Sequence, residues 1–172
     1  MTHKPRLNWP DGSGLSRDPK LPTLLLFVDP RCSTVNESIL GLRQLLERVD
    51  GRVRVLTLVS DSSQQAATQS SGFAIQSLRS IPGVSIHHDG DGRCALLYGA
   101  TVSGEAMLYF PDGTLHYRGS VDNSGDVENA GTSNPVLETC IVNASAPGRV
   151  MPVTGCLLRT SDWTRERFQT AM

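Results

Sequence analysis

The sequence predicts an α/β fold with a central mixed β-sheet flanked by helices. An unbroken apolar run at residues 24–28 is typical of a strand that is covered on both faces. A helical pattern follows it, and then a second apolar run at residues 53–59, so the two strands should be parallel and joined by a right-handed crossover. A Pro111-Asp112-Gly113 turn between two further strand-like segments predicts an antiparallel hairpin in the same sheet.

The first helix is expected to begin near Val35. Thr34 and Glu37 have the T-x-x-E spacing of a capping box, in which each side chain bonds an N–H group of the first turn. The apolar stripe of this helix consists of Ile39, Leu42, Leu46 and Val49. Such a stripe should pack on the sheet.

The later elements are read from periodicity and from turn residues. They are expected as a loop at residues 60–72, a helix at 73–79, a strand at 84–88, a helical turn at 93–98, and hairpin strands at 105–110 and 114–118. Asn134 and Pro135 then have the residue types of an N-cap and a first helical position. The helix that they start should turn Val136, Leu137, Cys140 and Ile141 inward.

A chain of 172 residues is a single domain by length. The predicted domain spans residues 21–160. Residues 1–20 are expected to form an extended N-terminal arm that Trp9 pins to the body, and residues 161–172 a C-terminal tail that can form a short helix. The net charge of −1 and the scattered basic residues give no reason to expect a nucleic-acid partner.

No stretch of the sequence has the ~18 consecutive apolar residues of a membrane span, and the first twenty residues lack the apolar core of a signal peptide. The sequence as written therefore predicts a cytoplasmic location with no membrane span. If the N-terminus is a trimmed one, a periplasmic or membrane-anchored location is the alternative.

Cys32 lies between the first strand and the first helix. Unpaired N–H groups and the positive end of the helix dipole gather at that position, and both favour a thiolate over a thiol. Cys32 should therefore have a pKa below the ordinary value of about 8.5 and be the most reactive of the four cysteines. Redox or nucleophilic chemistry is predicted.

The other cysteines give no sign of a metal site. The four positions, 32, 94, 140 and 156, contain no C-x-x-C pair, and adjacent His87 and His88 on a strand point to opposite faces. The acidic loop at residues 121–135 lacks the spacing of a calcium loop. We expect no metal and no cofactor, with Cys94 and Cys140 packed in the core as small apolar side chains.

The motif VDPRCST, residues 28–34, resembles the strand, x-P-x-C and helix of thioredoxin-like proteins, and among them RedB-type redox proteins, which typically read HP-x-C-P-C-T. Pro30 and Cys32 match, whereas Asp29, Ser33 and Thr34 replace the histidine, the proline and the second cysteine. YGATVSGEAMLYFPDGTLHYRGSV and PVTGCL extend the resemblance over most of residues 9–157. It implies a thioredoxin-like three-layer sandwich.

The same resemblance implies a thiol–disulfide redox protein whose attacking group is the Cys32 thiolate. Its partner would be a thiol or disulfide protein substrate or a small thiol. Thioredoxin-like folds usually place a cis-proline before the first hairpin strand, and here Ser103 and Gly104 stand there. The residues implied to contact substrate are Pro30, Arg31, Thr34, Ser103 and Gly104.

A second thiol is required to resolve a mixed disulfide or a sulfenic acid at Cys32. Neither Thr34 nor Val35 supplies one, so no local dithiol can form. The resembling family has a similar G-C near its C-terminus, which makes Cys156 the candidate resolving residue. The alternative, that Cys156 is another buried or free thiol, is open at this stage, because the sequence does not give the distance between the two Cα atoms.

Two further functions are compatible with the motif. A peroxiredoxin-type peroxidase also uses a single cysteine at a helix start, but Asp29 stands where such enzymes carry a threonine, and its carboxylate would repel a peroxide anion and raise the pKa of the thiol. Arg31 acts in the opposite direction. The lack of a second cysteine and of a cis-proline is also compatible with a non-catalytic binding scaffold.

Overall fold

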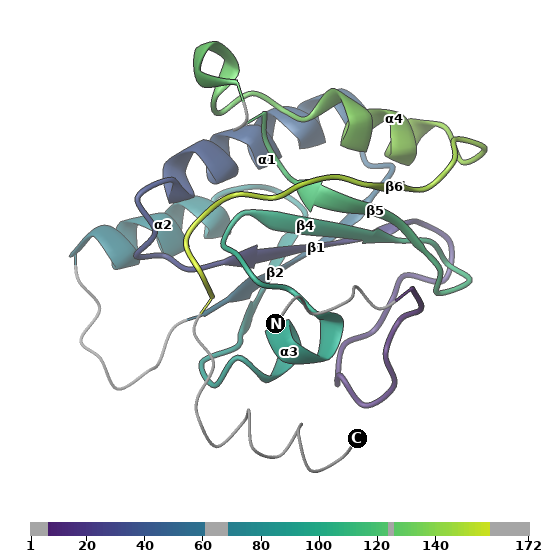
Figure 1. Cartoon of the computed structure of the whole chain (residues 1–172), viewed down its shortest axis with the longest axis horizontal. Helices are drawn as coiled ribbons and strands as arrows, with labels where there is room; N and C mark the ends of the chain where they lie inside the picture. The colour runs from purple at the N-terminus through teal and green to yellow at the C-terminus, as the bar shows by residue number, and fades with distance from the viewer. Residues whose placement is uncertain (1–6, 61–68, 124–125, 159–172) are drawn as a thin grey trace.

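A computed structural model describes residues 7–60, 69–123 and 126–158. These residues form a mixed sheet with strand order β3-β2-β1-β4-β5-β6, flanked by helices, as predicted (Figure 1). The elements are β1 (Thr23–Val28), α1 (Val35–Val49), β2 (Arg54–Val59), α2 (Gln69–Arg79), β3 (Val84–His88), α3 (Arg93–Tyr98), β4 (Glu105–Tyr109), β5 (Leu115–Ser120), the 3-10 turn Val127–Asn129, α4 (Pro135–Val142) and β6 (Arg149–Val150).

Strand β1 lies at the centre of the sheet. It pairs in parallel with β2 and antiparallel with β4, and all six of its residues are buried. An unbroken apolar sequence is stable there because helices or loops cover both of its faces. The predicted parallel strand pair and the predicted antiparallel hairpin β4–β5 are both confirmed.

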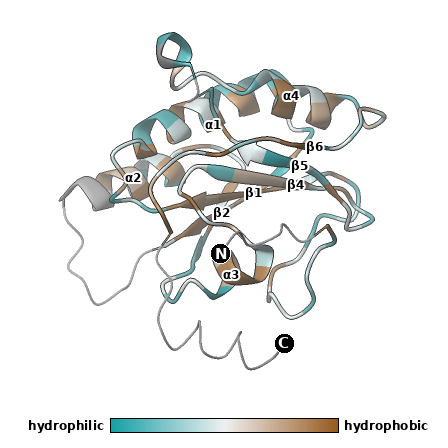
Figure 2. Cartoon of the chain, in the orientation of Figure 1, coloured by the Kyte–Doolittle hydropathy of each residue, from teal (hydrophilic) through white to brown (hydrophobic). Residues whose placement is uncertain are grey.

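Helices α1, α2 and α4 cover one face of the sheet, and α3 lies on the other with the N-terminal segment (Figure 1). Successive side chains of β1 point to opposite faces of the sheet. Leu24 and Leu26 therefore pack in the core under α1, and Leu25 and Phe27 pack in the core around α3. In Figure 2, β1 and β2 are mostly brown, so hydrophobic residues run through the middle of the sheet. This arrangement holds the end of β1, and hence Cys32, on a rigid base.

Helix α1 begins at the predicted residue, but the predicted capping box is wrong. The Thr34 side chain makes no capping hydrogen bond, and its hydroxyl lies 3.3 Å from Cys32 Sγ instead. The predicted stripe is buried at Ile39, Leu42 and Val49 and partly buried at Leu46, and Leu45 is buried as well. The backbone of Thr34, at φ −100° and ψ 13°, lacks the extended conformation from which a side chain usually caps a helix.

Helix α2 and strand β6 differ most from the sequence prediction, and the ends of β2, β4 and β5 differ from it by one or two residues. Helix α2 begins at Gln69, four residues before the predicted start, so the loop predicted at residues 60–72 is shorter. Strand β6 was not predicted, because two exposed residues carry no periodic signal. Residues 61–68 and the predicted tail helix at 161–172 lie outside the described residues.

Trp9 contacts the body of the protein as predicted. Its ring packs edge-on against Tyr98 and Tyr109, with centroid distances of 5.3 and 5.2 Å. The backbone N–H of Trp9 donates to the Gly113 carbonyl oxygen over 2.7 Å, and the Arg17 guanidinium lies over the Trp9 ring. The aromatic contacts and the hydrogen bond fix the segment before β1 on the face that carries α3.

Candidate active site at Cys32

Cys32 and Cys156 form a disulfide across the molecule. Their Cα atoms are 5.8 Å apart although they are separated by 124 residues in the chain. Cys32 follows β1 by four residues, whereas Cys156 lies on the extended segment after β6. Cys156 is therefore paired with Cys32 and is not a free thiol in this structure, and the sulfur that Cys32 meets lies far along the chain rather than at Thr34 or Val35.

The turn before Cys32 is held by a buried carboxylate. Asp29 accepts hydrogen bonds from the Arg31 backbone N–H at 2.9 Å and from the Arg31 guanidinium at 3.0 and 3.1 Å. The Asp29 residue is only 5% exposed, so this paired geometry compensates the burial of its charge. Because Arg31 neutralises it, the carboxylate repels an anion at Cys32 less than the sequence alone implied.

Thr34 contacts the sulfur that would react. Its Oγ1 lies 3.3 Å from Cys32 Sγ, and since a disulfide sulfur carries no proton, the hydroxyl is the donor. If the disulfide opens with Cys32 as the leaving thiolate, the same hydroxyl is positioned to stabilise the negative charge, together with the N–H groups at the start of α1. Thr34 thus contributes a hydrogen bond to the sulfur of Cys32.

Ser103 links the two halves of the site. Its backbone N–H donates to the Cys156 carbonyl oxygen over 2.8 Å, and its hydroxyl accepts from the Asp29 N–H over 2.9 Å. Ser103 therefore contacts both the turn that carries Cys32 and the segment that carries Cys156.

Gly104 serves a different purpose. Its φ is +90°, and a Cβ at this position would lie 2.7 Å from the Ser38 hydroxyl of α1. Its N–H and carbonyl groups are already bonded to Phe27 and Val121. Glycine is therefore required for close approach to α1 rather than for its own hydrogen bonds. No cis peptide bond occurs in the described residues, so a cis-proline is replaced here by ordinary trans backbone.

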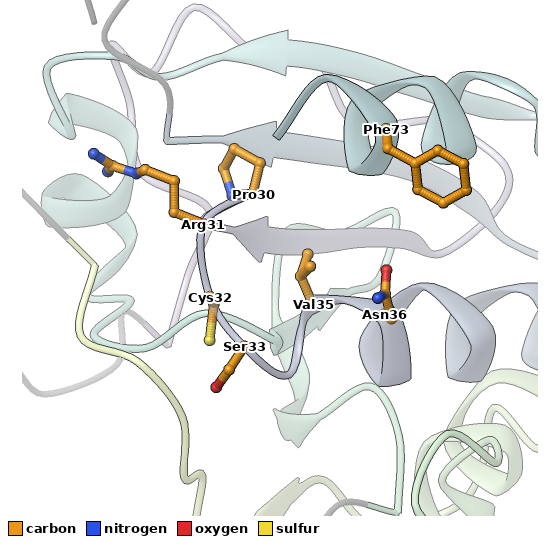
Figure 3. Close-up of a pocket in the computed structure, with 7 residues that line it drawn as sticks. All are labelled: Pro30, Arg31, Cys32, Ser33, Val35, Asn36 and Phe73. Carbon is orange, nitrogen blue, oxygen red and sulfur yellow. The ribbon is translucent and has the colours of Figure 1, made fainter. Parts of the chain in front are cut away.

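An open pocket lies beside Cys32 (Figure 3). Pro30 and Arg31 line it, as does Phe73 from α2, whose ring is on the far side of the pocket from Cys32. Phe73 is 68% exposed, so its ring is open to solvent at the edge of the pocket. The pocket thus offers an apolar rim as well as the Arg31 charge.

The two remaining cysteines are packed, as predicted. Cys94 in α3 and Cys140 in α4 are free thiols and are 5% and 3% exposed. Burial, reinforced by Asp89, raises the pKa of Cys94 to about 12, and burial likewise raises the pKa of Cys140. Neither is suited to act as a nucleophile at neutral pH.

The described residues hold no group of three His, Cys, Asp or Glu side chains that could bind a metal ion. None of the helices in this part of the chain is long and apolar enough to cross a membrane.

Three residues at this site were missed by sequence reasoning. Phe73 was taken only as the first residue of a helix, and its exposure depends on where α2 lies. Glu105 belongs to no motif, and Gly155 entered the sequence analysis only as part of the G-C pair that singled out Cys156, although a glycine directly before a cysteine can also indicate a close backbone approach. Their roles come from contacts between distant segments, described below.

No protein-family model and no curated protein matches the sequence significantly. Solved structures do resemble it. A hypothetical protein from Sinorhizobium meliloti 1021 has a TM-score of 0.68 at 16% identity, covering 91% of this chain and 96% of that one. An uncharacterized conserved protein from Geobacillus kaustophilus has a TM-score of 0.66 at 18% identity, covering 94% and 92%.

A thioredoxin-like protein in its oxidized form aligns with a TM-score of 0.59 at 10% identity, over 82% of this chain and 98% of the other. At such identities the likeness concerns the fold. Together with the mixed sheet and its flanking helices, it shows that the chain has an α/β fold of the thioredoxin-like type.

Proposed function

We propose that this protein catalyses thiol–disulfide exchange, with Cys32 as the attacking thiolate and Cys156 as the resolving thiol. The observation that carries the proposal is the disulfide between them, which joins the β1–α1 turn to a segment 124 residues away. Exchange chemistry needs two sulfurs that can approach each other, one of them at a position that stabilises a thiolate.

In the reducing direction, the Cys32 thiolate attacks one sulfur of a substrate disulfide. A new Cys32–substrate S–S bond forms, the substrate S–S bond breaks, and the other substrate sulfur leaves as a thiolate. The Cys156 thiolate then attacks Cys32 Sγ, restores the Cys32–Cys156 bond and releases the second substrate thiolate. The substrate gains two electrons and the protein loses two, so an external dithiol must reduce the protein again.

The residues around Cys32 fit these steps. The Thr34 hydroxyl supports the attacking Cys32 thiolate, the Asp29–Arg31 pair fixes the turn, and Pro30, Arg31 and Phe73 line the space that a substrate would enter. We further propose that the protein is functionally similar to RedB-type redox proteins, with Thr34 in place of their second local cysteine and Cys156 as the resolving residue. A thiol or disulfide protein, or a small thiol, is the proposed partner. A cytoplasmic location is also proposed, where such a bond would form only transiently.

The proposal is tested by single-turnover reduction of a small disulfide reagent. The fully reduced protein should reduce one equivalent and finish with a Cys32–Cys156 link by peptide mapping. Cys32→Ser should abolish the reaction, and Cys156→Ser should stop at a mixed disulfide on Cys32. Cys94→Ala is the matched control and should behave like the parent. If Cys32 stays reduced in the parent, exchange is refuted and a binding scaffold is the better assignment.

Replacing the disulfide reagent by hydrogen peroxide separates exchange from the peroxidase alternative. A peroxidase would form a Cys32 sulfenic acid and then the disulfide with loss of water, at a rate well above that of a free cysteine. We expect a slow reaction with peroxide and a fast one with disulfides. The opposite order would assign the site to a peroxidase.

A further inference from the structure

The segment that carries Cys156 runs antiparallel to the loop before β4 and is joined to it by main-chain hydrogen bonds and one isolated bridge. Ser103 N–H donates to the Cys156 carbonyl at 2.8 Å, and Leu158 N–H donates to the Thr101 carbonyl at 2.9 Å. Between these two bonds, Val102 and Leu157 form an antiparallel bridge. An extended chain is therefore held by main-chain bonds while its cysteine is joined to Cys32.

A buried ion pair supports the backbone edge, residues 101–103, against which this segment lies. Glu105 is fully buried, pairs with Arg118, and accepts hydrogen bonds from the Thr101 N–H at 2.8 Å and the Val102 N–H at 3.4 Å. Arg118 also donates to the Gly99 carbonyl at 3.2 Å. These contacts fix the backbone of residues 99–102. The Ser103 N–H and the Thr101 carbonyl then face the segment that carries Cys156.

The backbone edge at residues 101–103 restricts which side chains a segment lying against it can carry. A Cβ on Gly155 would lie 2.6 Å from the Ser103 carbonyl oxygen, so only glycine fits directly before the cysteine. Leu158, two residues after the cysteine, is 8% exposed and belongs to the core around α3, whereas Leu157 between them is 75% exposed. The pattern that fits is therefore glycine, cysteine, any residue, and then an apolar residue.

We propose that residues 155–158 occupy the docking place of a cysteine-containing peptide, so that opening the Cys32–Cys156 bond frees an edge selective for the pattern Gly-Cys-x-apolar. This inference rests on the proposed exchange function and names the peptide class that the site selects. The chain's own segment competes with the partner for the edge, and reduction removes the covalent bond that keeps it in place.

The exchange on this edge follows the proposed chemistry. The reduced Cys32 thiolate attacks the cysteine sulfur of a docked peptide that is part of a disulfide, the peptide–leaving-group S–S bond breaks, and the leaving sulfur departs as a thiolate. The peptide then takes the place of residues 155–158. In the parent protein, Cys156 completes the cycle by displacing the peptide and closing the Cys32–Cys156 bond.

The selectivity is tested on full-length Cys156→Ser with the peptide Val-Thr-Gly-Cys-Leu-Leu, activated at its cysteine as a mixed disulfide with 2-thiopyridine. The release of thiopyridone gives the rate, and mass spectrometry verifies Cys32 as the site. Alanine in place of the peptide's glycine, or serine in place of its last leucine, should slow the reaction about tenfold, because main-chain bonds or apolar burial are lost. Serine in place of the first leucine is the matched control and should leave the rate unchanged.

Occupancy by the chain's own segment is tested with glycine variants in the same Cys156→Ser background. Gly155→Ala should weaken docking of the segment and speed the reaction with the parent peptide several-fold. Gly148→Ala is the control, because a Cβ there meets its nearest atom at an ordinary 3.5 Å. Matching thermal melts of the two variants would show that both fold.

The outcomes separate the two proposals. If neither the peptides nor glutathione activated in the same way react at Cys32, the exchange function fails. If glutathione reacts but all peptides react at one rate, or if Gly155→Ala behaves like Gly148→Ala, exchange stands and the docking inference is overturned.

Discussion

The chemistry of Cys32 depends on its immediate neighbours. The Thr34 hydroxyl at 3.3 Å and the start of α1 favour a negative sulfur, and the Asp29 carboxylate that would oppose it is paired with Arg31. Cys94 and Cys140 are about as buried as Cys32 but lie within helices α3 and α4, where burial raises the pKa of both thiols. We therefore expect the Cys32 thiol to be more reactive than those of Cys94 and Cys140.

The first prediction concerns thiol reactivity. After complete reduction, iodoacetamide near pH 8 should label Cys32 first, and native Cys94 and Cys140 should remain unlabelled, since the pKa of Cys94 is about 12 and that of Cys140 is also raised. Residue-resolved mass spectrometry over a pH series measures this. Denatured protein, in which all four thiols should label alike, is the control. Labelling of Cys94 or Cys140 as fast as Cys32 in the folded protein would contradict the assignment.

Single elements of the fold position the site. The Glu105–Arg118 pair joins β4 and β5 and, through Thr101 and Val102, fixes the loop in front of β4. Strand β1 supplies the rigid base on which Cys32 stands. A buried ion pair is sensitive to the loss of one partner, because the other charge is then left without compensation.

The second prediction follows from that pair. Glu105→Gln should lower the free energy of unfolding by about 3 kcal/mol, because Arg118, whose side chain is 13% exposed, loses its counter-charge. Glu138→Gln is the matched control: it breaks the exposed Arg48–Glu138 pair and should cost under about 1 kcal/mol. Urea denaturation of both variants measures the difference. Equal costs would show that the buried pair does not stabilise the loop.

The third prediction concerns the order of stability among the strands. Amide hydrogen exchange should be slowest in β1 and β2, which lie inside the sheet and are almost completely buried. The edge strand β3, whose residues are partly or fully exposed, is the internal reference and should exchange sooner. Rapid exchange at residues 25–27 would argue against a strand that is covered on both faces.

For the whole molecule, the disulfide is a constraint as well as a reactive group. It closes a loop over most of the described chain, from the β1–α1 turn to the last segment. In the chain-entropy account, a cross-link over such a separation disfavours the unfolded state by up to about 5 kcal/mol. The oxidised protein should therefore be the more stable form, and reduction should leave the sheet in place while it loosens residues 155–158.

The fourth prediction concerns the stability that is lost when the Cys32–Cys156 disulfide is reduced. Reduction of the parent should lower the free energy of unfolding by about 2 to 5 kcal/mol, measured by denaturant titration with and without reductant. Cys156→Ser is the control, because its stability should be the same in both buffers. A parent protein whose midpoint does not move on reduction would mean that the bond is absent in solution.

Local patterns were enough for much of this fold. The apolar run at residues 24–28, the start of α1 at Val35, the Asn134–Pro135 cap and the Pro111-Asp112-Gly113 hairpin each depend on a few adjacent residues, and each was predicted where it occurs. The position of Cys32 between strand and helix follows from the same local information. Such features are readable because propensity, turn geometry and periodicity act within one or two turns of chain.

The tertiary structure alone decided the rest of the site. Cys156 was equally consistent with a free thiol until the fold brought its Cα within 5.8 Å of Cys32, because no local pattern encodes a contact across 124 residues. The Thr34 hydroxyl was expected on the helix and is found at the sulfur, and the close approach of Gly155 to Ser103 exists only between two segments that meet in space. Long-range pairing depends on how whole elements pack, so these contacts appear only once β1, β4 and the chain after β6 are placed side by side.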